Sequence, residues 1–387
     1  MTIPVNLSKR KLKNSQSEFD GYNIAYFISP HGYGHAARAC SVMAEMHDIN
    51  PSIKFEIFTT IPRWFFQQSL SGSFAYHSLL TDIGMVQKTP LQEDLPETLQ
   101  KLNNFLPYDE SQIESISKDI NKIRCQLIIC DISPMGIVVA QKARVPSVLI
   151  ENFTWDWVYE NYVSADFPAD QHVDYLKKIF KSANYHIQTE PVCHYRNVDL
   201  TTSPISRKVR NSPQQVRQSL SIPDETKVVM VTMGGIPEKH NFLNQLKHHC
   251  DVHFIIPGSS QTARFVDNLV LLPHHSDFFH PDIVNACDAV VGKLGYSTLA
   301  EVFHAGVPYG YIPRFSFKES EILEAFVKNQ MSGFAITEAQ YQEGDWMYLL
   351  PELLGLPRIR RNVPNGSEDA AKFIYKLLCN NESISKS

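Results

Sequence analysis

The sequence predicts an α/β protein of two domains in tandem, each built on a parallel sheet. Three observations support this prediction. Short apolar runs alternate with helical segments, a glycine-rich turn opens each of two such series, and a polar, proline-containing stretch near Pro204 separates the series. The 387 residues, 43% of them hydrophobic, exceed what one core normally holds. In such sheets, ligands bind at the carboxyl ends of the strands.

The first domain is expected over residues 21–203, after a basic arm at residues 1–20. The arm has no apolar core of the kind found in secretory signals, and we interpret it as disordered. A solvated tail is the simpler reading, and contact with anionic lipid at a membrane surface is the alternative.

Within the first domain, apolar runs and helical spacing predict the elements in chain order. Strands are expected at residues 23–29, 54–60, 74–79, 126–130, 146–150 and 185–189. Helices are expected at residues 36–46, shortly after Pro62, and at 111–123 and 134–143. Three prolines interrupt residues 81–107, which predicts a long irregular segment that could recognise an acceptor.

The second domain is expected over residues 204–364, and residues 365–387 should form a last helix and a tail. Strands are predicted at residues 227–232, 253–256, 269–272, 289–291 and 309–312. Helices are predicted from the turn at 233–237 to about residue 249, then at 282–286, 296–305, 319–329 and 368–378. The last of these helices is expected to return and brace the first domain.

Composition excludes several classes of function. A net charge of −5 gives no electrostatic reason to expect nucleic acid as the partner. Seven scattered cysteines without a C-x-x-C pair, and 15 histidines without metal-ligand spacing, predict no zinc site, no bound metal and a reducing, cytoplasmic setting. The apolar runs are far shorter than a membrane span.

The stretch from Val290 to Glu301 carries the strongest functional signal. It reads as a buried strand, a glycine turn and a helix, so that the free N–H groups of the helix point into the ligand crevice. We interpret it as a nucleotide diphosphate site, with Glu301 placed to accept hydrogen bonds from a ribose diol. An ordinary strand–turn–helix is the alternative. The candidate residues are Lys293, Gly295, Tyr296, Ser297, Thr298 and Glu301.

A second glycine turn, from His31 to His35, follows the first predicted strand. Histidine is the natural base near neutral pH, and both histidines are expected at the carboxyl edge of the sheet. Asp131 stands at the end of a later strand, and residues 151–157 gather aromatic and polar side chains at the end of another. The tryptophans of that segment fit either core packing or the wall of an active site.

The architecture and these motifs resemble the GT-B glycosyltransferases. Residues 293–301 have the spacing of the nucleotide-sugar signature in UDP-glycosyltransferases, with a lysine where that signature has histidine. Met233-Gly234-Gly235 is similar to the loop under the diphosphate in the lipid-linked peptidoglycan N-acetylglucosaminyltransferase. Residues 31–38, 152–156 and 292–296 most resemble the N-terminal region of plant L-arabinokinase and its stand-alone bacterial relatives.

The resemblance implies metal-independent sugar transfer, with inversion, from a UDP-sugar to a hydroxyl of a small molecule, lipid or glycan. His31 would be the base, oriented by Asp131. His35 is the second candidate, for which a structural role at the helix start is the alternative. No cofactor besides the donor is expected. The other implied residues are Gly234, Gly235, Glu319 and Glu321 toward the donor, and Tyr33, Asn152 and Trp155 toward the acceptor.

Two other functions fit the same features. A GT-B-fold epimerase would use the cleft without an acceptor. A nucleotide-sugar-binding regulatory module would bind the donor and transfer nothing, which the likeness to a region fused to a kinase permits.

Overall fold

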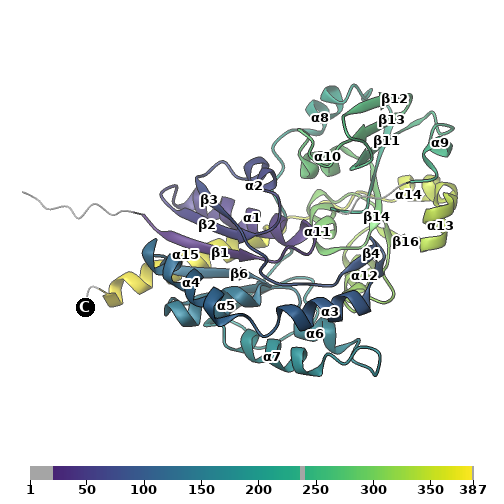
Figure 1. Ribbon diagram of the computed structural model, residues 1–387. Helices are drawn as coiled ribbons and strands as arrows, with labels where there is room; N and C mark the ends of the chain where they lie inside the picture. The colour runs from purple at the N-terminus through teal and green to yellow at the C-terminus, as the bar shows by residue number, and fades with distance from the viewer. Residues whose placement is uncertain (1–20, 236–239, 386–387) are drawn as a thin grey trace, which may run out of the picture.

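The computed structural model describes residues 21–235 and 240–385. The basic arm predicted at residues 1–20 lies outside them. The chain forms two α/β domains (Figure 1). Residues of both domains line one cavity. In this part of the chain, no helix combines the length and the apolar character needed to cross a membrane.

The N-terminal domain, as far as it is described, contains a seven-stranded parallel sheet in the order β3-β2-β1-β6-β7-β8-β9. Its strands are β1 (Asn23–Ile28), β2 (Lys54–Thr59), β3 (Phe74–Ser78), β6 (Leu127–Asp131), β7 (Ser147–Glu151), β8 (Tyr185–Thr189) and β9 (Leu200–Thr202). Its helices are α1 (Gly34–Ile49), α2 (Arg63–Ser69), α3 (Leu95–Phe105), α4 (Glu110–Lys122), α5 (Pro134–Ala143), α6 (Trp155–Glu160) and α7 (Asp170–Lys181). Every residue of β6 and β7 is buried, as expected where helices cover both faces.

The C-terminal domain contains a second sheet, whose strands within the described residues follow the order β12-β13-β11-β10-β14-β15-β16. Among the strands described, β12 at the edge is antiparallel to its neighbour and the others are parallel. The strands are β10 (Lys227–Thr232), β11 (Val252–Pro257), β12 (Arg264–Val266), β13 (Leu269–Leu272), β14 (Ala289–Lys293), β15 (Tyr309–Ile312) and β16 (Gly333–Ala335). The helices are α8 (Pro213–Ser219), α9 (Leu243–Leu246), α10 (His280–Ala286), α11 (Tyr296–Ala305), α12 (Glu319–Gln330), α13 (Glu338–Glu343), a 3-10 helix (Asp345–Leu349) and α14 (Leu350–Gly355).

The last helix, α15 (Gly366–Ser385), returns to the N-terminal domain (Figure 1). Ala370 and Ile374 of this helix are fully buried in the same apolar core as Ala36 and Met43 of α1. Burying these side chains stabilises the domain at roughly 25 cal/mol for each Å² of apolar surface removed from water. The prediction that the chain end braces the first domain is therefore confirmed.

The segment at residues 81–107 is more regular than predicted. It forms a short hairpin, β4 (Gln87–Thr89) with β5 (Gln92–Glu93), and then the three-turn helix α3. The prediction was wrong because Pro96 was read as a helix breaker. Pro96 occupies the first turn, where its missing N–H costs nothing, and the Asp94 side chain caps the helix by accepting from the Glu97 amide at 3.1 Å.

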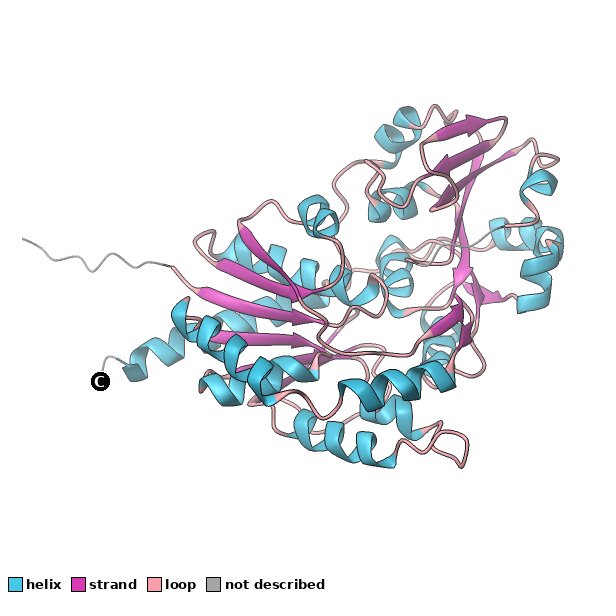
Figure 2. Ribbon diagram, viewed as in Figure 1, coloured by secondary structure: helices cyan, strands magenta, loops and turns pink. Residues whose placement is uncertain are grey.

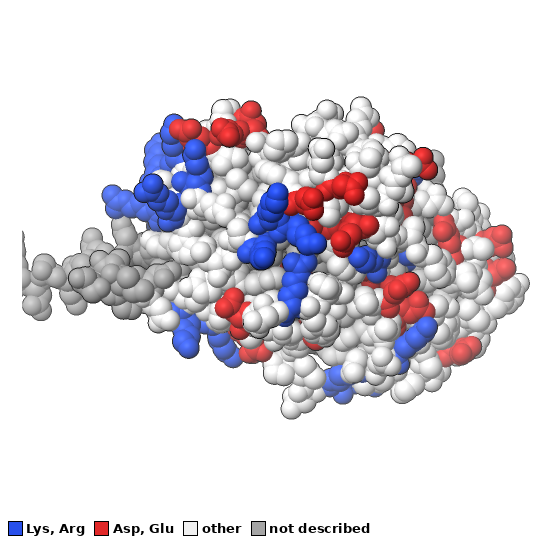
Figure 3. Space-filling model, turned by 90° about the horizontal axis from the view of Figure 1, so that it is seen from below, with Lys and Arg blue, Asp and Glu red and all other residues white. Residues whose placement is uncertain are grey.

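The strands of the N-terminal sheet point toward the C-terminal domain (Figure 2). Both domains therefore contribute strand ends and helix starts to the space between them. The loop after β15 closes one side of this space, and its Phe317 is buried in the core of the N-terminal domain. On the face seen from below, basic and acidic side chains are interspersed in small groups (Figure 3).

Candidate active site

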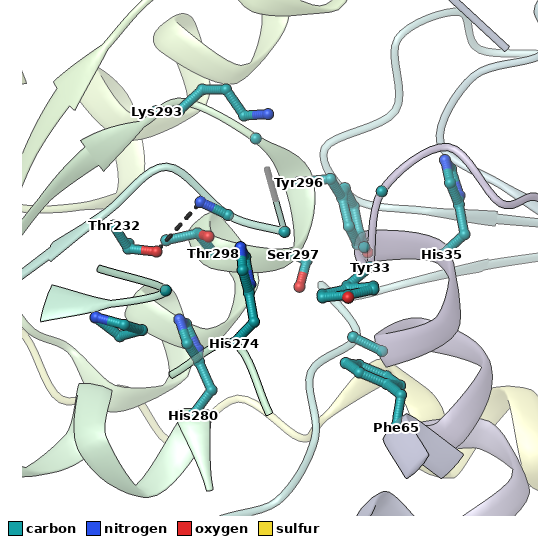
Figure 4. Close-up of a pocket in the computed structure, with 18 of the residues that line it drawn as sticks. Tyr33, His35, Phe65, Thr232, His274, His280, Lys293, Tyr296, Ser297 and Thr298 are labelled. Atoms are coloured by element: carbon teal, nitrogen blue, oxygen red, sulfur yellow. Dashed lines mark hydrogen bonds between the residues drawn. The ribbon is translucent and has the colours of Figure 1, made fainter. Parts of the chain in front are cut away.

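A cavity of about 190 Å³ lies between the domains. The N-terminal domain contributes residues 31–35 and the aromatic side chains of Trp64 and Phe65 from α2. The C-terminal domain contributes Gly234 and Gly235 and the start of α11. Figure 4 shows Lys293 reaching in from one side, with Tyr33 and His35 on the opposite side. The two predicted glycine turns thus meet at one site.

The helix α11 begins at this cavity without a side-chain cap. Gly292 lets β14 lie against the carbonyl group of Thr232 in β10, which a Cβ would prevent. The chain then turns at Gly295, and residues 295–298 line the cavity. The first N–H groups of an α-helix have no partner within the helix, and they carry the positive end of its dipole. This end of α11 is therefore suited to bind an anion.

A second helix start, that of α1, meets the first. The N-cap of α1, Tyr33, also makes no side-chain cap hydrogen bond, and Gly34 and His35 line the cavity. A Cβ on Gly34 would lie 3.4 Å from the Cβ of Ser297. Two positive helix ends therefore converge, which strengthens the attraction for a negatively charged group.

The side chain of Lys293 adds a full positive charge to this region. Its Cε lies 3.9 Å from the position that a Cβ would take on either Gly234 or Gly295. Gly234 has φ +75°, a conformation that favours glycine, and its amide donates to Thr232 Oγ1 at 3.2 Å. Gly234 was predicted to face the donor, but its amide already donates a hydrogen bond to Thr232 in this structure. A Cβ on Gly235 would collide with the ring of Tyr33, so the two loops are in close contact.

Asp131 is paired with His35, and the predicted pairing with His31 is wrong. His35 Nδ1 lies 3.0 Å from Asp131 Oδ1. The register explains this arrangement, because Ile28 at the end of β1 pairs with Asp131, and α1 starts a few residues later. His35 therefore lies directly above the end of β6.

Arg38, one helical turn after His35, completes the cluster. Its Nε donates to Asp131 Oδ2 at 2.8 Å and its Nη2 to Oδ1 at 2.6 Å. Burial alone would raise the pKa of Asp131, but the charge of Arg38 and the hydrogen bonds from His35 and Arg38 outweigh it, so the pKa is lowered. Asp131 is therefore ionised at neutral pH.

His31 lies in a different environment. Its ring is edge-on to Trp155, with centroids 5.1 Å apart, and a Cβ on Gly84 would lie 2.8 Å from its Nδ1. Burial, followed by the electrostatic effects of His35, Arg314 and Lys293, holds the pKa of His31 well below its ordinary value. His31 lines the cavity as a neutral ring, but its carboxylate partner is missing among the described residues.

The predicted acceptor residues have different outcomes. Asn152 lines the cavity, accepts from Arg38 Nη1 at 2.8 Å and donates to Glu319 Oε1 at 2.9 Å. Trp155 is 1% exposed and packs in the core beside Tyr159, so its side chain is part of the core and does not form the cavity wall. Tyr33 lies between the domains, edge-on to Trp64 and to His274.

Glu301, predicted to accept hydrogen bonds from a ribose, is buried and is not among the residues that line the cavity. Its Oε1 accepts from Arg207 Nη2 at 3.0 Å, and its Oε2 lies 2.6 Å from His280 Nδ1. Burial alone would raise the pKa of Glu301, but the charges and hydrogen bonds of Arg207 and His280 outweigh it. The pKa of Glu301 is therefore lowered, and the carboxyl is ionised. The ring of His280 lines the cavity in its place.

Glu319 and Glu321 were both predicted to face the donor. Glu319 lines the cavity, is 4% exposed and lies 3.5 Å from Arg314 Nη2. Glu321 is exposed and absent from the cavity wall, because residues two apart on a helix point in different directions. Among the described residues, no group of three or more His, Cys, Asp or Glu side chains is arranged to hold a metal ion.

Comparisons with known proteins decide the family. The sequence profile of glycosyl transferase family 1 matches residues 22–351. The chain belongs to glycosyl transferase family 1. It is also 26% identical over 363 residues to L-arabinokinase from Arabidopsis thaliana, covering 91% of this chain but only 34% of that relative.

Solved glycosyltransferase structures share the fold of this glycosyltransferase. The glycosyltransferase of kitacinnamycin superposes with a TM-score of 0.64 at 14% identity, and the spinosyn forosaminyltransferase with 0.62 at 15%. Each comparison covers 92% of this chain and 99% of the other. A glycosyltransferase from Medicago truncatula, complexed with UDP-glucose, gives 0.59 at 12% identity, over 93% of this chain and 98% of that one. The predicted GT-B fold of two Rossmann-like domains is confirmed.

Sequence reasoning missed several residues of this glycosyltransferase site. Arg38 lies within the motif at residues 31–38, and its position one helical turn after His35 could have indicated that the two side chains are neighbours. Arg207 and His280 gave none, since they lie 94 and 21 residues from Glu301 in the chain. Arg314 and Phe317 belong to the loop that crosses to the other domain, which no local pattern predicts.

Proposed function

We propose that this chain transfers a sugar from a UDP-sugar to a hydroxyl acceptor, without a metal ion and with inversion at the anomeric carbon. The observation that carries the proposal is the meeting, at one cavity, of an Asp131-bound histidine with two uncapped helix starts and Lys293. A base and an anion site facing each other are what this transfer needs.

His35 is the base in this proposal, in place of His31. With Nδ1 turned to Asp131, its Nε2 is free to accept the proton of the acceptor hydroxyl. The acceptor oxygen then forms a bond to the anomeric carbon as the bond to the diphosphate oxygen breaks on the opposite face. The proton remains on Nε2, and Asp131 stabilises the resulting imidazolium. A single displacement of this kind inverts the configuration.

The leaving diphosphate takes up the bonding electrons, and its charge needs a counter-charge. Lys293 and the N-terminal ends of α11 and α1 would supply it, with Ser297 and Thr298 as hydroxyl donors. These groups make a metal ion unnecessary for charge neutralisation. We therefore propose no cofactor beyond the donor substrate.

The nucleoside would lie on the side of the cavity lined by His274 and His280. We assign the ribose to His280 Nε2, with Glu301 acting through His280. The choice of uridine is supported by the UDP-glucose complex of the Medicago truncatula neighbour. The sugar would lie near Glu319, and the acceptor would be a small molecule, lipid or glycan. A cytoplasmic setting fits the seven free cysteines.

A second candidate is a regulatory module that binds the nucleotide sugar and transfers nothing. The observation that favours it is that the chain matches 34% of the length of L-arabinokinase, so that the likeness is to one region of a larger protein.

Release of UDP from a panel of UDP-sugars, with and without a panel of hydroxylated acceptors, tests the proposal. Acceptor-dependent release that disappears in His35→Gln and Lys293→Ala is expected. Saturable UDP binding by calorimetry, without release under any combination, would support the regulatory module. If UDP does not bind, both functions fail.

A further inference from the structure

The cluster around Asp131 holds one more charged group than a histidine–carboxylate pair requires. Asp131 is completely buried, and Arg38 is 2% exposed. Arg38 contacts both carboxylate oxygens, whereas His35 contacts one. A planar guanidinium bound to both oxygens of a carboxylate is the strongest pairing available to that group. The positive charge of Arg38 therefore neutralises the negative charge of Asp131 without any contribution from His35.

The hydrogen bonds fix which nitrogen of His35 carries its proton. Nδ1 lies 3.0 Å from Asp131 Oδ1 and 3.3 Å from Arg38 Nη2. Since an ionised carboxylate can only accept, an unprotonated Nδ1 at 3.0 Å would bring two lone pairs together. Nδ1 therefore carries the hydrogen, and Nε2 holds the lone pair that a base uses.

A histidine buried beside an unmatched carboxylate behaves differently. The carboxylate would attract a second proton onto the imidazole, because a buried charge needs an opposite charge nearby. The resulting imidazolium has no lone pair and cannot act as a base. We propose that Arg38 is a positioning residue that neutralises Asp131, so that His35 stays a neutral base with Nε2 unprotonated.

Contacts from the C-terminal domain hold Arg38 in this place. Its Nη1 donates to Asn152, whose amide in turn donates to Glu319 of α12. The face of the guanidinium lies over the ring of Tyr296, the first residue of α11, at 5.0 Å from its centroid. Both the edge and the face of the Arg38 guanidinium are therefore in contact with other groups. The guanidinium cannot turn away from Asp131 without breaking contacts to the other domain.

The surrounding titratable groups leave this charge count unchanged. Burial raises the pKa of Tyr26 on β1 and of Tyr296 on α11, and it raises the pKa of the Cys193 thiol, so all three are neutral. Burial lowers the pKa of His31, which is neutral as well. The charges facing the cluster are then those of Asp131 and Arg38, with Glu319 and its partner Arg314 beyond Asn152.

The proposal rests on the proposed role of His35, but its test needs no substrate and is therefore independent of the transferase assay. The whole chain is labelled with nitrogen-15 at its 15 histidines, and the His35 signals are assigned by their loss in His35→Gln. Nitrogen chemical shifts and long-range proton couplings at pH 7.5 then report which ring nitrogens carry hydrogen.

We expect one hydrogen, on Nδ1, in the wild-type chain and in Arg38→Lys, which keeps the charge. We expect two hydrogens in Arg38→Gln, and one again in the double variant Arg38→Gln with Asp131→Asn. A residue with only a structural role would change stability without adding this proton. His35 remaining neutral in Arg38→Gln, or doubly protonated in the wild type, would overturn the proposal.

If Arg38→Gln does not fold, citrulline at position 38 gives the same test, because it removes the charge and keeps the length and planarity of the side chain. A second proton on His35 is again expected, and a neutral ring contradicts the proposal.

Discussion

Asp131 and Glu301, two of the carboxylates buried near the cavity, have the same kinds of partner in different settings. Each contacts one arginine and the Nδ1 of one histidine whose ring lines the cavity. The Nδ1-to-oxygen distance is 3.0 Å for His35 with Asp131 and 2.6 Å for His280 with Glu301. The two clusters differ in how the arginine contacts the carboxylate.

Arg38 contacts both oxygens of Asp131 and comes from the same helix as His35. Arg207 bonds one oxygen of Glu301, and its Nε has no hydrogen-bond partner. It also donates to Ser69 of the other domain and lies against the rings of Phe65 and Phe279. The three residues of the Asp131 cluster therefore come from one domain, and the other domain contacts the cluster through Tyr296. In the Glu301 cluster, the arginine itself comes from the linker and donates to a serine of the N-terminal domain.

The largest expected effect separates the two histidines. His35→Gln should lower kcat about 10³-fold, because removing a general base costs 10²–10⁴ in rate. His280→Gln should leave kcat within a few-fold and weaken UDP binding about tenfold, as loss of one hydrogen bond would. Steady-state kinetics of UDP release, together with calorimetric titration of UDP, measure both quantities.

His31→Gln serves as the matched control, since this side chain lines the same cavity without a carboxylate partner among the described residues. A loss of kcat in His31→Gln as large as that in His35→Gln would return the base to His31. Equal losses of kcat in the His35 and His280 variants would remove the functional difference between the two clusters.

A second effect is expected on stability. Asp131→Asn should lower the free energy of unfolding by about 3 kcal/mol, because it leaves the buried Arg38 without its counter-charge. Glu301→Gln should cost about 1–2 kcal/mol, because Arg207 keeps its contacts with two aromatic rings and a serine. Urea denaturation at pH 7.5 gives both values. A larger loss in Glu301→Gln would mean that the cluster between the domains is the more rigid one.

The fold and its ligand edge could be predicted because both follow from local patterns. Strands β1, β6 and β14 are apolar runs followed by turns, and parallel sheets place their ends at one edge. The prediction of an anion site at the start of α11 follows from the same logic. The prediction that Asp131 pairs with His31 was wrong, because its partner is His35, four residues later. The sequence places both histidines in one glycine-rich turn and does not reveal that only His35 lies over the end of β6.

The partners of Glu301 could not be predicted at all. Its carboxylate is satisfied by a linker residue and by the first residue of α10, and only the tertiary fold brings them together. Phe317 is a similar case. Its side chain is buried in the core of the N-terminal domain, so it adds nothing to the periodic apolar pattern of the domain in which it lies in the sequence. Contacts between the domains are where sequence reasoning was weakest.

Acid should weaken both clusters. The pKa values of Asp131 and Glu301 are lowered, each by an arginine and a histidine that outweigh the opposing effect of burial. Their stabilisation is therefore complete above the ordinary carboxyl pKa of about 4 and is lost as the pH falls below it. Between pH 5 and pH 3, we expect Asp131→Asn to lose about 1 kcal/mol less stability than the wild type. An unchanged acid dependence of the urea midpoint would contradict the ionised state of Asp131.

Another buried carboxyl, Asp82, shows what happens without a cation, and its pH dependence should have the opposite sign. Asp82 is 4% exposed, accepts from Ser29 Oγ at 2.9 Å, and has no partner at Oδ2. Burial raises its pKa to about 8, so the folded protein keeps a proton that the unfolded chain releases above about pH 4. Its contribution to stability is then largest at low pH and falls as the pH rises toward 8.

Asp82→Asn removes this titration and keeps the shape and the acceptor of the Ser29 hydrogen bond. The variant should be more stable than the wild type by about 1 kcal/mol or more at pH 8, and nearly equal to it at pH 4.5, since each pKa unit corresponds to about 1.4 kcal/mol. Urea denaturation at the two pH values measures the difference. Equal stability at pH 8 would mean that Asp82 is ionised in the folded protein despite its burial. The expected result would show that the arginine beside Asp131 and Glu301, and not the depth of burial, sets the sign of their response to pH.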